Sequence, residues 1–284
     1  MIIQNCGFYN FLFDARSLHI QESIQANKIV YKSKNYNFWL KEEQKLLANA
    51  AFVSVVSKSM ITYFTSVLDR RIMYCPIIAN FDILRFCNDY RSKIRVEFGW
   101  ESKRIYVYSG SLGLYGINKD YLAKLIILIR SFDTNCAFMF LVSNSAKEVH
   151  LLLNQCNLDA ETVYIADVKY EDMYKYLSAA DIGIHALPRQ LDSSTRLGTK
   201  VVEYWSAGLP VLINDNVGEA ANLVHDLKLG KVLNLEYKYS KEEFENVLFF
   251  LDSMNRSSIR ARTQSLFDVS QISQRYKDIY NEIV

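Results

Sequence analysis

Residues 193–211 read SSTRLGTKVVEYWSAGLPV, and this stretch decides the fold that we expect for the chain. A polar loop precedes a helical pattern from Thr199 to Ala207, and a glycine then leads to an apolar strand that begins at Pro210. Gly198 allows a ligand to approach the backbone closely, and the free amides at a helix N-terminus attract phosphate. The stretch therefore predicts a phosphate site where the loop meets the helix.

Glu203 has the most specific predicted role in this stretch. It follows Thr199 by one helical turn, which places the two residues on one face, about 6 Å apart along the axis. This is roughly the offset between the diphosphate and the ribose of one nucleotide, and a carboxylate can accept hydrogen bonds from both ribose hydroxyls. We predict that Glu203 binds the ribose; the alternative is a solvated glutamate paired with Lys200.

Strand-like and helix-like runs alternate around this stretch, as in a parallel sheet that is covered by helices. The expected strands are 105–109, 137–142, 162–166, 181–186, 210–214 and 231–235. The expected helices between them are 119–131, 146–155, 170–180, 199–207 and 219–226. Six strands in this order predict a complete doubly wound α/β domain that binds its ligand at the carboxyl ends of the strands.

The rest of the chain predicts a smaller α/β portion and a helical end. Strand-like runs at 10–13, 52–56 and 72–78 surround a helix at 38–50 and a second helix capped by Ser57, and three helices are expected at 241–253, 257–266 and 271–283. Segment 89–103 is charged, lacks apolar periodicity and is interpreted as a connection. The predicted division is 1–88, a partial N-terminal Rossmann-like portion; 89–104, the connection; 105–268, the ligand-binding domain; and 269–284, a helix that packs back toward the N-terminal portion.

The bulk composition favours an ordinary globular protein. Half of the 284 residues are hydrophobic, and 33 Lys and Arg face 31 Asp and Glu, so the charge balance does not call for nucleic acid as a partner. The five cysteines lack zinc-ligand spacing, so no metal site is predicted. No apolar run approaches the ~20 residues of a membrane span, and no signal peptide is recognisable, so a cytoplasmic location is predicted.

The motifs taken together resemble the family 4 glycosyltransferases of the GT-B type. That family has a Glu-x7-Glu pattern and a helix that ends in Ala-x-Gly-Leu-Pro-Val, and here Glu203 follows Thr195 by eight positions. Four further segments resemble family elements: the first strand and glycine turn, the nucleobase segment, the interdomain motif and the last glycine loop, at 105–113, 163–184, 80–86 and 216–219. The resemblance covers residues 105–284 and extends to 36–88.

The resemblance implies a GT-B-like fold with a complete C-terminal Rossmann-like domain and a truncated N-terminal Rossmann-like portion, because barely a hundred residues precede the donor half. It also implies transfer of a sugar from a nucleotide diphosphate-sugar donor to a hydroxyl of a saccharide or lipid-linked saccharide, with retention of configuration and without a metal or other cofactor. The implied setting is surface polysaccharide synthesis at the inner face of a membrane. The expected donor-binding residues are Gly110, Ser111, Val168, Thr195, Arg196, Leu197, Gly198, Thr199, Lys200 and Glu203.

The chain departs from the family pattern at the sugar and phosphate contacts. Thr195 replaces the first Glu, and Ser111 and Tyr115 stand where an Arg and a Lys are expected, so Arg196 and Lys200 are the candidate replacements. No catalytic base is identifiable; the candidates for catalysis are His19, His185 and Thr195. Asp14 and Arg16 follow the first strand-like run and, with His19, are candidates for lining the cleft.

The sequence leaves two other functions to compare with a complete glycosyltransferase, and one hint of membrane contact. A chain with so short an N-terminal portion could bind a nucleotide-sugar without catalysis and need a partner subunit for the acceptor half. A Rossmann oxidoreductase is disfavoured because Gly110, Gly113 and Gly116 do not form the Gly-x-Gly-x-x-Gly motif. The cluster Arg256, Arg260 and Arg262 is the one hint of membrane contact, with a solvated helix face as its alternative.

Overall fold

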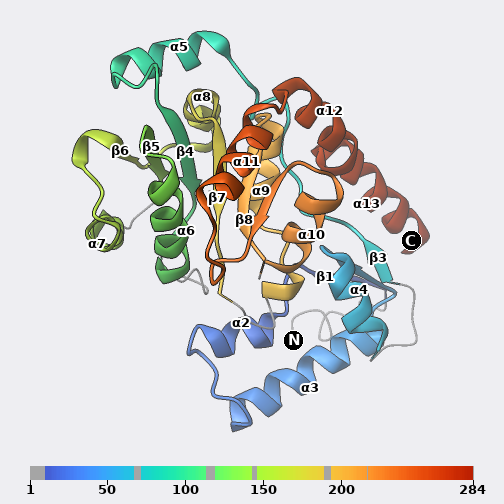
Figure 1. The fold of residues 1–284 in the computed structure, drawn as a ribbon. Coiled ribbons are helices and arrows are strands. Elements are labelled where there is room, and N and C mark those ends of the chain that lie inside the picture. The colour runs from blue at the N-terminus through green and yellow to red at the C-terminus, as the bar shows by residue number, and fades with distance from the viewer. Residues whose placement is uncertain are drawn as a thin grey trace.

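The computed structural model describes residues 10–66, 72–112, 119–142, 146–188, 193–215 and 217–283. These residues form two parallel sheets, one for each portion of the chain (Figure 1). The smaller sheet, in the N-terminal portion, has the order β1-β2-β3, with β1 at Leu12–Ala15, β2 at Phe52–Val55 and β3 at Ile72–Tyr74. The chain is therefore α/β throughout, with a small N-terminal Rossmann-like portion and a larger C-terminal domain.

The larger sheet has the strand order β6-β5-β4-β7-β8-β9. Its strands are β4 (Arg104–Ser109), β5 (Cys136–Leu141), β6 (Val163–Ala166), β7 (Ile182–His185), β8 (Val211–Asn214) and β9 (Gly230–Leu233). All six predicted strands are present, with ends shifted by two residues at most. The order reverses between β4 and β7, and doubly wound sheets bind ligands outside the carboxyl ends of the strands at such a switch point.

Helices cover both faces of this sheet, because alternate side chains of each strand point to opposite faces. On β4, Ile105 and Val107 belong to one hydrophobic core, and Tyr106 and Tyr108 belong to the other. The helices of the domain are α6 (Lys119–Phe132), α7 (Ala146–Cys156), α8 (Met173–Ala179), α9 (Thr199–Ser206), α10 (Gly218–Asp226), α11 (Lys241–Asp252) and α12 (Arg256–Phe267). Burial on both faces explains why the strands read as continuous apolar runs.

The segment interpreted as a connection contains a helix, α5 (Asn88–Glu97), which the sequence pattern did not predict. Tertiary contacts hold this helix in place. Arg91 and Arg95 form ion pairs with Asp181 at 2.6 and 3.0 Å, and both arginines donate hydrogen bonds to the Ala179 carbonyl at the end of α8. The helix is fixed by charge pairing with a residue about ninety positions away, which apolar periodicity cannot reveal.

The N-terminal portion carries α2 (His19–Gln25), α3 (Lys34–Asn49) and α4 (Lys58–Thr65). The predicted cap of α4 is confirmed, because the Ser57 hydroxyl accepts a hydrogen bond from the Met60 amide at 3.1 Å. The sequence pattern did not predict α2. This short helix lacks a side-chain cap and buries only Ile20 and Ser23, so it has little local signal.

The last helix, α13 (Val269–Ile283), leaves the large domain and packs against the small sheet (Figure 1). Ile279 and Ile283 pack with Cys75, and the Tyr276 hydroxyl donates a hydrogen bond to Asp14 at 3.0 Å. Where the chain passes between the portions, the Ala79 amide donates to Phe267, and the Val269 amide donates to Ala79, at 3.0 and 3.2 Å. Two passages of the chain thus run side by side between the portions.

Candidate functional site

A cavity of about 360 Å³ lies between the two portions, at the carboxyl ends of β4 and β7. The N-terminal portion and the passage beside it contribute Arg16, Ser17, Glu22, Val56 and Ile77. The large domain contributes Gly110, Ser111, His185, Leu187, Arg196, Leu197, Gly198, Thr199 and Lys200. The cavity therefore occupies the switch point of the large sheet and is closed on its other side by the small portion.

Seven of the ten expected donor-binding residues line this cavity: Gly110, Ser111, Arg196, Leu197, Gly198, Thr199 and Lys200. Val168, Thr195 and Glu203 do not line it, although Glu203 is one helical turn from Thr199. His185 and Arg16 also line the cavity, whereas His19 lines a separate cavity between α2 and α3. Gly113, Tyr115, Gly116 and Asn216 fall outside the described residues.

Five of the lining residues were not expected from the sequence: Ser17, Glu22, Val56, Ile77 and Leu187. Val56 and Leu187 follow the carboxyl ends of β2 and β7, so the rule that ligands bind at strand ends could have found them. Ser17 and Glu22 lie at the unpredicted helix α2. Their place in the cavity depends on how the two portions meet.

Tyr204 fixes the position of α9 beneath the cavity. Its hydroxyl accepts a hydrogen bond from the Ser109 amide at 2.7 Å, at the end of β4. Its ring lies against Gly183, where an added Cβ would be only 2.4 Å from the ring. Glycine on β7 and tyrosine on α9 together bring the N-terminus of this helix to the end of β4.

The N-terminus of α9 lines the cavity. Gly198 is the N-cap residue and supplies no side-chain cap, and Gly198, Thr199 and Lys200 all line the cavity. Across from this turn, Gly110 has a φ of +129°, and the Lys200 side chain passes within 3.7 Å of the position of an added Cβ. The site therefore combines a helix N-terminus with a glycine turn, an arrangement that suits an anion.

His185, at the end of β7, is buried to 5% exposure beside this turn. Neither of its ring nitrogens has a hydrogen-bond partner within the described part of the chain. Burial, together with the smaller effect of the positive charges on Arg196 and Lys200, lowers the pKa of His185 to about 4. An added Cβ on Gly198 would lie 3.0 Å from Nε2. The imidazole is thus neutral near pH 7, and its polar atoms are available to a ligand in the cavity.

His185 predicts a specific loss of stability in acid. Because its pKa is lower in the folded state than in the unfolded state, the unfolded chain binds the proton better, and stability falls as the pH drops from about 6.5 to 4. The contribution is on the order of 3 kcal/mol. We expect His185→Gln to lose less unfolding free energy over this interval than the wild type, measured by urea denaturation. His150→Gln, at an exposed position, is the control; parallel losses in all three proteins would contradict the prediction.

Among the described residues, three cations line the cavity, and each is paired with a carboxylate. Arg196 pairs with Glu22 at 3.0 Å, Arg16 pairs with Asp14 at 3.1 Å, and Lys200 pairs with Glu203 at 2.9 Å. The Ser17 hydroxyl donates to Glu22 at 2.7 Å and so orients the partner of Arg196. Arg196 and Glu22 belong to different portions of the chain, so their ion pair also joins the two walls of the cavity.

The structure corrects the alternative interpretation of Glu203 as a solvated residue. Glu203 is paired with Lys200, but it is 4% exposed. Burial raises the pKa of its carboxyl group, and Lys200 counteracts part of that rise. Burial is the main cause of the raised pKa of the Tyr170 phenol. The nearby carboxylate of Glu203 raises that pKa further. Glu203 thus lies between the Lys200 side of the cavity and the loop that follows β6.

The arginine cluster on α12 is mainly structural. The Arg256 guanidinium donates hydrogen bonds to the carbonyls of Ala207 and Ala180, and Arg260 donates to the Leu84 carbonyl. Arg262 is exposed. Two of the three arginines therefore tie α12 to neighbouring backbone, and the expectation of a solvated helix face is wrong for these two.

No group of three or more His, Cys, Asp or Glu side chains in the described ranges could hold a metal ion. Across the same residues, every helix is too short or too polar to cross a membrane.

Comparison with known proteins identifies the fold. No protein-family model matches the chain, and no curated protein matches it by sequence. The structure is similar to sucrose-phosphate synthase from Thermosynechococcus elongatus (TM-score 0.73, 15% identity), over 98% of this chain and 69% of that one. It is similar to WaaG, a glycosyltransferase involved in lipopolysaccharide biosynthesis (TM-score 0.65, 16% identity), over 96% of this chain and 75% of that one.

A third similar structure holds nucleotide and sugar. Anabaena HepE in complex with UDP and glucose has a TM-score of 0.63 and 14% identity, over 95% of this chain and 71% of that one. At this level of identity the likeness establishes the fold and leaves the activity to be argued from the site. The chain therefore has the GT-B fold of these glycosyltransferases, with its cavity at the switch point of the C-terminal domain.

Proposed function

We propose that the chain binds a nucleotide diphosphate-sugar in the cavity and transfers the sugar to an acceptor hydroxyl. One observation carries the proposal: the N-terminus of α9, the buried neutral His185 and three cations surround one cavity at the switch point of a GT-B fold. Such a site suits an anionic group joined to a polar, uncharged one. A nucleotide diphosphate-sugar has this chemistry, and HepE, which shares the fold, was solved with UDP-glucose.

The proposed donor lies along α9. The diphosphate binds the amides of Gly198 and Thr199 and the side chains of Arg196 and Lys200. The ribose hydroxyls donate to Glu203, and the base lies near Val168 and the loop after β6. Lys200 forms an ion pair with Glu203. When the donor binds, Lys200 is proposed to leave the Glu203 carboxylate and to pair with the diphosphate, which frees Glu203 to bind the ribose.

The proposed chemistry depends on stabilising the departing diphosphate. Negative charge develops on the leaving group, and the helix N-terminus with Arg16, Arg196 and Lys200 is arranged to neutralise it. Side chains can carry this charge, which supports a mechanism that needs no metal ion. Neutral His185, which lines the cavity, is proposed to donate or accept a hydrogen bond with the sugar. Retention of configuration is proposed from the family resemblance.

The acceptor is proposed to enter from the small portion, which supplies Arg16, Ser17 and Glu22 to the opposite wall. A saccharide or lipid-linked saccharide of a surface polysaccharide is the proposed class, since WaaG, which shares the fold, acts in lipopolysaccharide biosynthesis. The small sheet has three strands in the described residues, which motivates the second candidate function. In that case the chain binds the donor and a partner subunit completes the acceptor side.

A panel of labelled nucleotide-sugars, beginning with UDP-glucose, separates these functions. We expect the purified chain to bind one member and, with a saccharide acceptor mixture, to release the nucleoside diphosphate in equal amount with a labelled glycoside. Binding without release or transfer would favour the half-enzyme. Absence of binding to every member would remove both proposals.

A further inference from the structure

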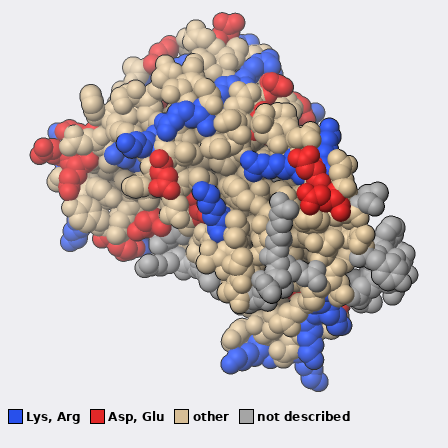
Figure 2. Space-filling model, turned by 90° about the vertical axis from the view of Figure 1, so that its right-hand side faces the viewer, with Lys and Arg blue, Asp and Glu red and all other residues tan. Residues whose placement is uncertain are grey.

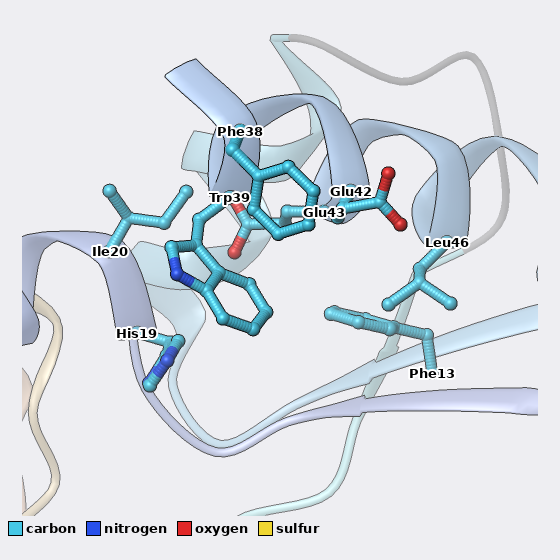
Figure 3. Close-up of a pocket in the computed structure, with 8 residues that line it drawn as sticks. All are labelled: Phe13, His19, Ile20, Phe38, Trp39, Glu42, Glu43 and Leu46. Atoms are coloured by element: carbon cyan, nitrogen blue, oxygen red, sulfur yellow. The ribbon is translucent and has the colours of Figure 1, made fainter. Parts of the chain in front are cut away.

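The cavity between α2 and α3 has an aromatic wall. Its volume is about 350 Å³, and it shares no lining residue with the donor cavity. Phe38 and Trp39 on α3 and Phe13 on β1 contribute rings to it, and Ile20 and Leu46 complete its apolar lining. Figure 3 shows Phe13 across the cavity from the two rings of α3. A ligand in this cavity would be surrounded mainly by carbon.

Two of the rings form a corner that is open to a ligand. The ring centroids of Phe38 and Trp39 are 5.3 Å apart, and the ring planes are inclined by 78°. The two side chains line the cavity and are still 47% and 46% exposed. The face of an aromatic ring carries partial negative charge, and rings set at an angle around an ammonium group form the aromatic cages that bind organic cations. The corner therefore suits a cation.

The charged groups of the wall are acidic. Glu42 and Glu43 line the cavity, and no Lys or Arg of the described residues does so. Glu42 is paired with the exposed Lys45 at 2.6 Å. Glu43 is half-buried and has no ion-pair partner in the described part of the chain, and burial raises the pKa of its carboxyl group. Carboxylates removed from water are normally paired, so Glu43 supplies a charge that a bound cation would compensate.

The lysines at this end of the molecule lie outside the cavity. Lys28, Lys32, Lys34 and Lys41 are exposed, and none of them lines it. In Figure 2, blue side chains project into the solvent from the lower end of the molecule, where Figure 1 places α3. Salt screens exposed charges over about 8 Å at physiological ionic strength, whereas a ligand in the cavity would touch the wall. The wall therefore decides which charge the cavity accepts.

We propose that this cavity binds a small organic cation, an ammonium group that carries apolar substituents. The ring faces of Phe38 and Trp39 and the carboxylate of Glu43 attract the charge, while the substituents fill the apolar remainder. A phosphorylated ligand is disfavoured because its charge has the same sign as the wall. The donor cavity, which three cations line, selects the opposite charge. This proposal stands independently of the proposed transferase activity.

Choline and its uncharged isostere dimethylbutanol, in which carbon replaces the nitrogen, test the proposal by calorimetric titration of the full chain. The two molecules have the same shape, so their difference in affinity measures the recognition of charge. We expect choline to bind about tenfold more tightly than dimethylbutanol. Phosphocholine should bind more weakly than choline, because its phosphate is repelled by Glu42 and Glu43. Equal affinities for choline and dimethylbutanol, no binding of choline, or tighter binding of phosphocholine would overturn the proposal.

Two positions separate the contributions of charge and ring. Glu43→Gln keeps the size of the side chain and should lower the affinity for choline by about tenfold, with the affinity for dimethylbutanol unchanged. Trp39→Leu should lower the affinity for choline by about fivefold, and Trp39→Phe should retain part of it because phenylalanine also presents an aromatic face. Neither side chain is buried, so these variants leave the core intact.

Glu148→Gln is the matched control. Glu148 is also a half-buried glutamate on a helix, α7, and it lines neither the aromatic nor the donor cavity. This variant should bind choline as the wild type does, and Glu43→Gln should bind a nucleoside diphosphate as the wild type does. Equal losses of choline affinity in Glu43→Gln and Glu148→Gln would contradict the proposal, as would no loss in Glu43→Gln.

Trp39 provides an independent spectroscopic test. Of the three tryptophans, Trp100 and Trp205 are buried, so a change of tryptophan emission on adding choline reports Trp39. We expect a change that saturates at the midpoint found by calorimetry and is absent in Trp39→Phe. Unchanged emission of the wild type at saturating choline would show that the cation binds elsewhere and would overturn the assignment of this cavity.

Discussion

Glu203→Gln is expected to lower the affinity for a nucleoside diphosphate by about a hundredfold or more while leaving the fold intact. Two charge-assisted hydrogen bonds from a ribose would be weakened, and each such bond contributes about 1.5–3 kcal/mol. Glutamine keeps the size of the side chain, so no cavity forms in the buried position. Isothermal titration calorimetry of both proteins measures the difference.

The same substitution should preserve or raise stability at neutral pH. The folded state raises the pKa of Glu203, so it binds the proton more tightly than the unfolded state does. Stability from this group is therefore fully present below the ordinary glutamate pKa and is lost as the pH rises through the raised value. A glutamine at this position does not ionise, so the loss of unfolding free energy with rising pH is absent in the variant. We expect the melting temperature of the variant to equal or exceed that of the wild type at pH 7, with the difference disappearing in acid.

Asp133→Asn provides the matched control. Asp133 is another buried carboxylate and is paired with Arg104 at 2.6 Å, but it lies near the amino end of β4, away from the cavity. This variant should lose stability and retain nucleotide affinity. If Glu203→Gln binds the nucleoside diphosphate as tightly as the wild type does, Glu203 does not bind the ribose.

The large domain could be predicted because its signals are local. Each strand is a short apolar run between polar turns, and Gly198 and Gly208 mark the two ends of α9, so order and boundaries follow from the sequence. The phosphate end of the site is predictable for the same reason. Gly198, Thr199 and Lys200 are consecutive in the sequence and all line the cavity. In a parallel sheet, the helix after a strand begins near the carboxyl end of that strand, where ligands bind.

The unpredicted features depend on contacts between distant segments. Helix α5 is held by Asp181, and Glu22 lines the cavity as the ion-pair partner of Arg196 from the other portion. The burial of Glu203 and the absence of partners for His185 in the described residues follow from how α9 packs on β4 and β7. A single sequence contains no direct signal for such pairings, because each is set by tertiary geometry.

The diphosphate is expected to supply most of the binding free energy at this site. Arg16, Arg196 and Lys200 line the cavity beside the N-terminus of α9, so each phosphate gains charge-assisted hydrogen bonds that a nucleoside lacks. At about 1.5–3 kcal/mol per bond, the nucleoside diphosphate should bind at least a hundredfold more tightly than the nucleoside. The ion pairs that already hold these cations reduce the gain, because a ligand must displace Glu22 or Glu203.

Calorimetric titration of the wild-type chain with a nucleoside, its monophosphate and its diphosphate tests the central claim most directly. We predict affinity that rises with each phosphate, falls with added salt, and depends on Lys200, so that Lys200→Gln removes most of the gain from the second phosphate. Equal affinities across the series, or no binding by any member for every base, would contradict the claim that this cavity binds the diphosphate of a nucleotide-sugar.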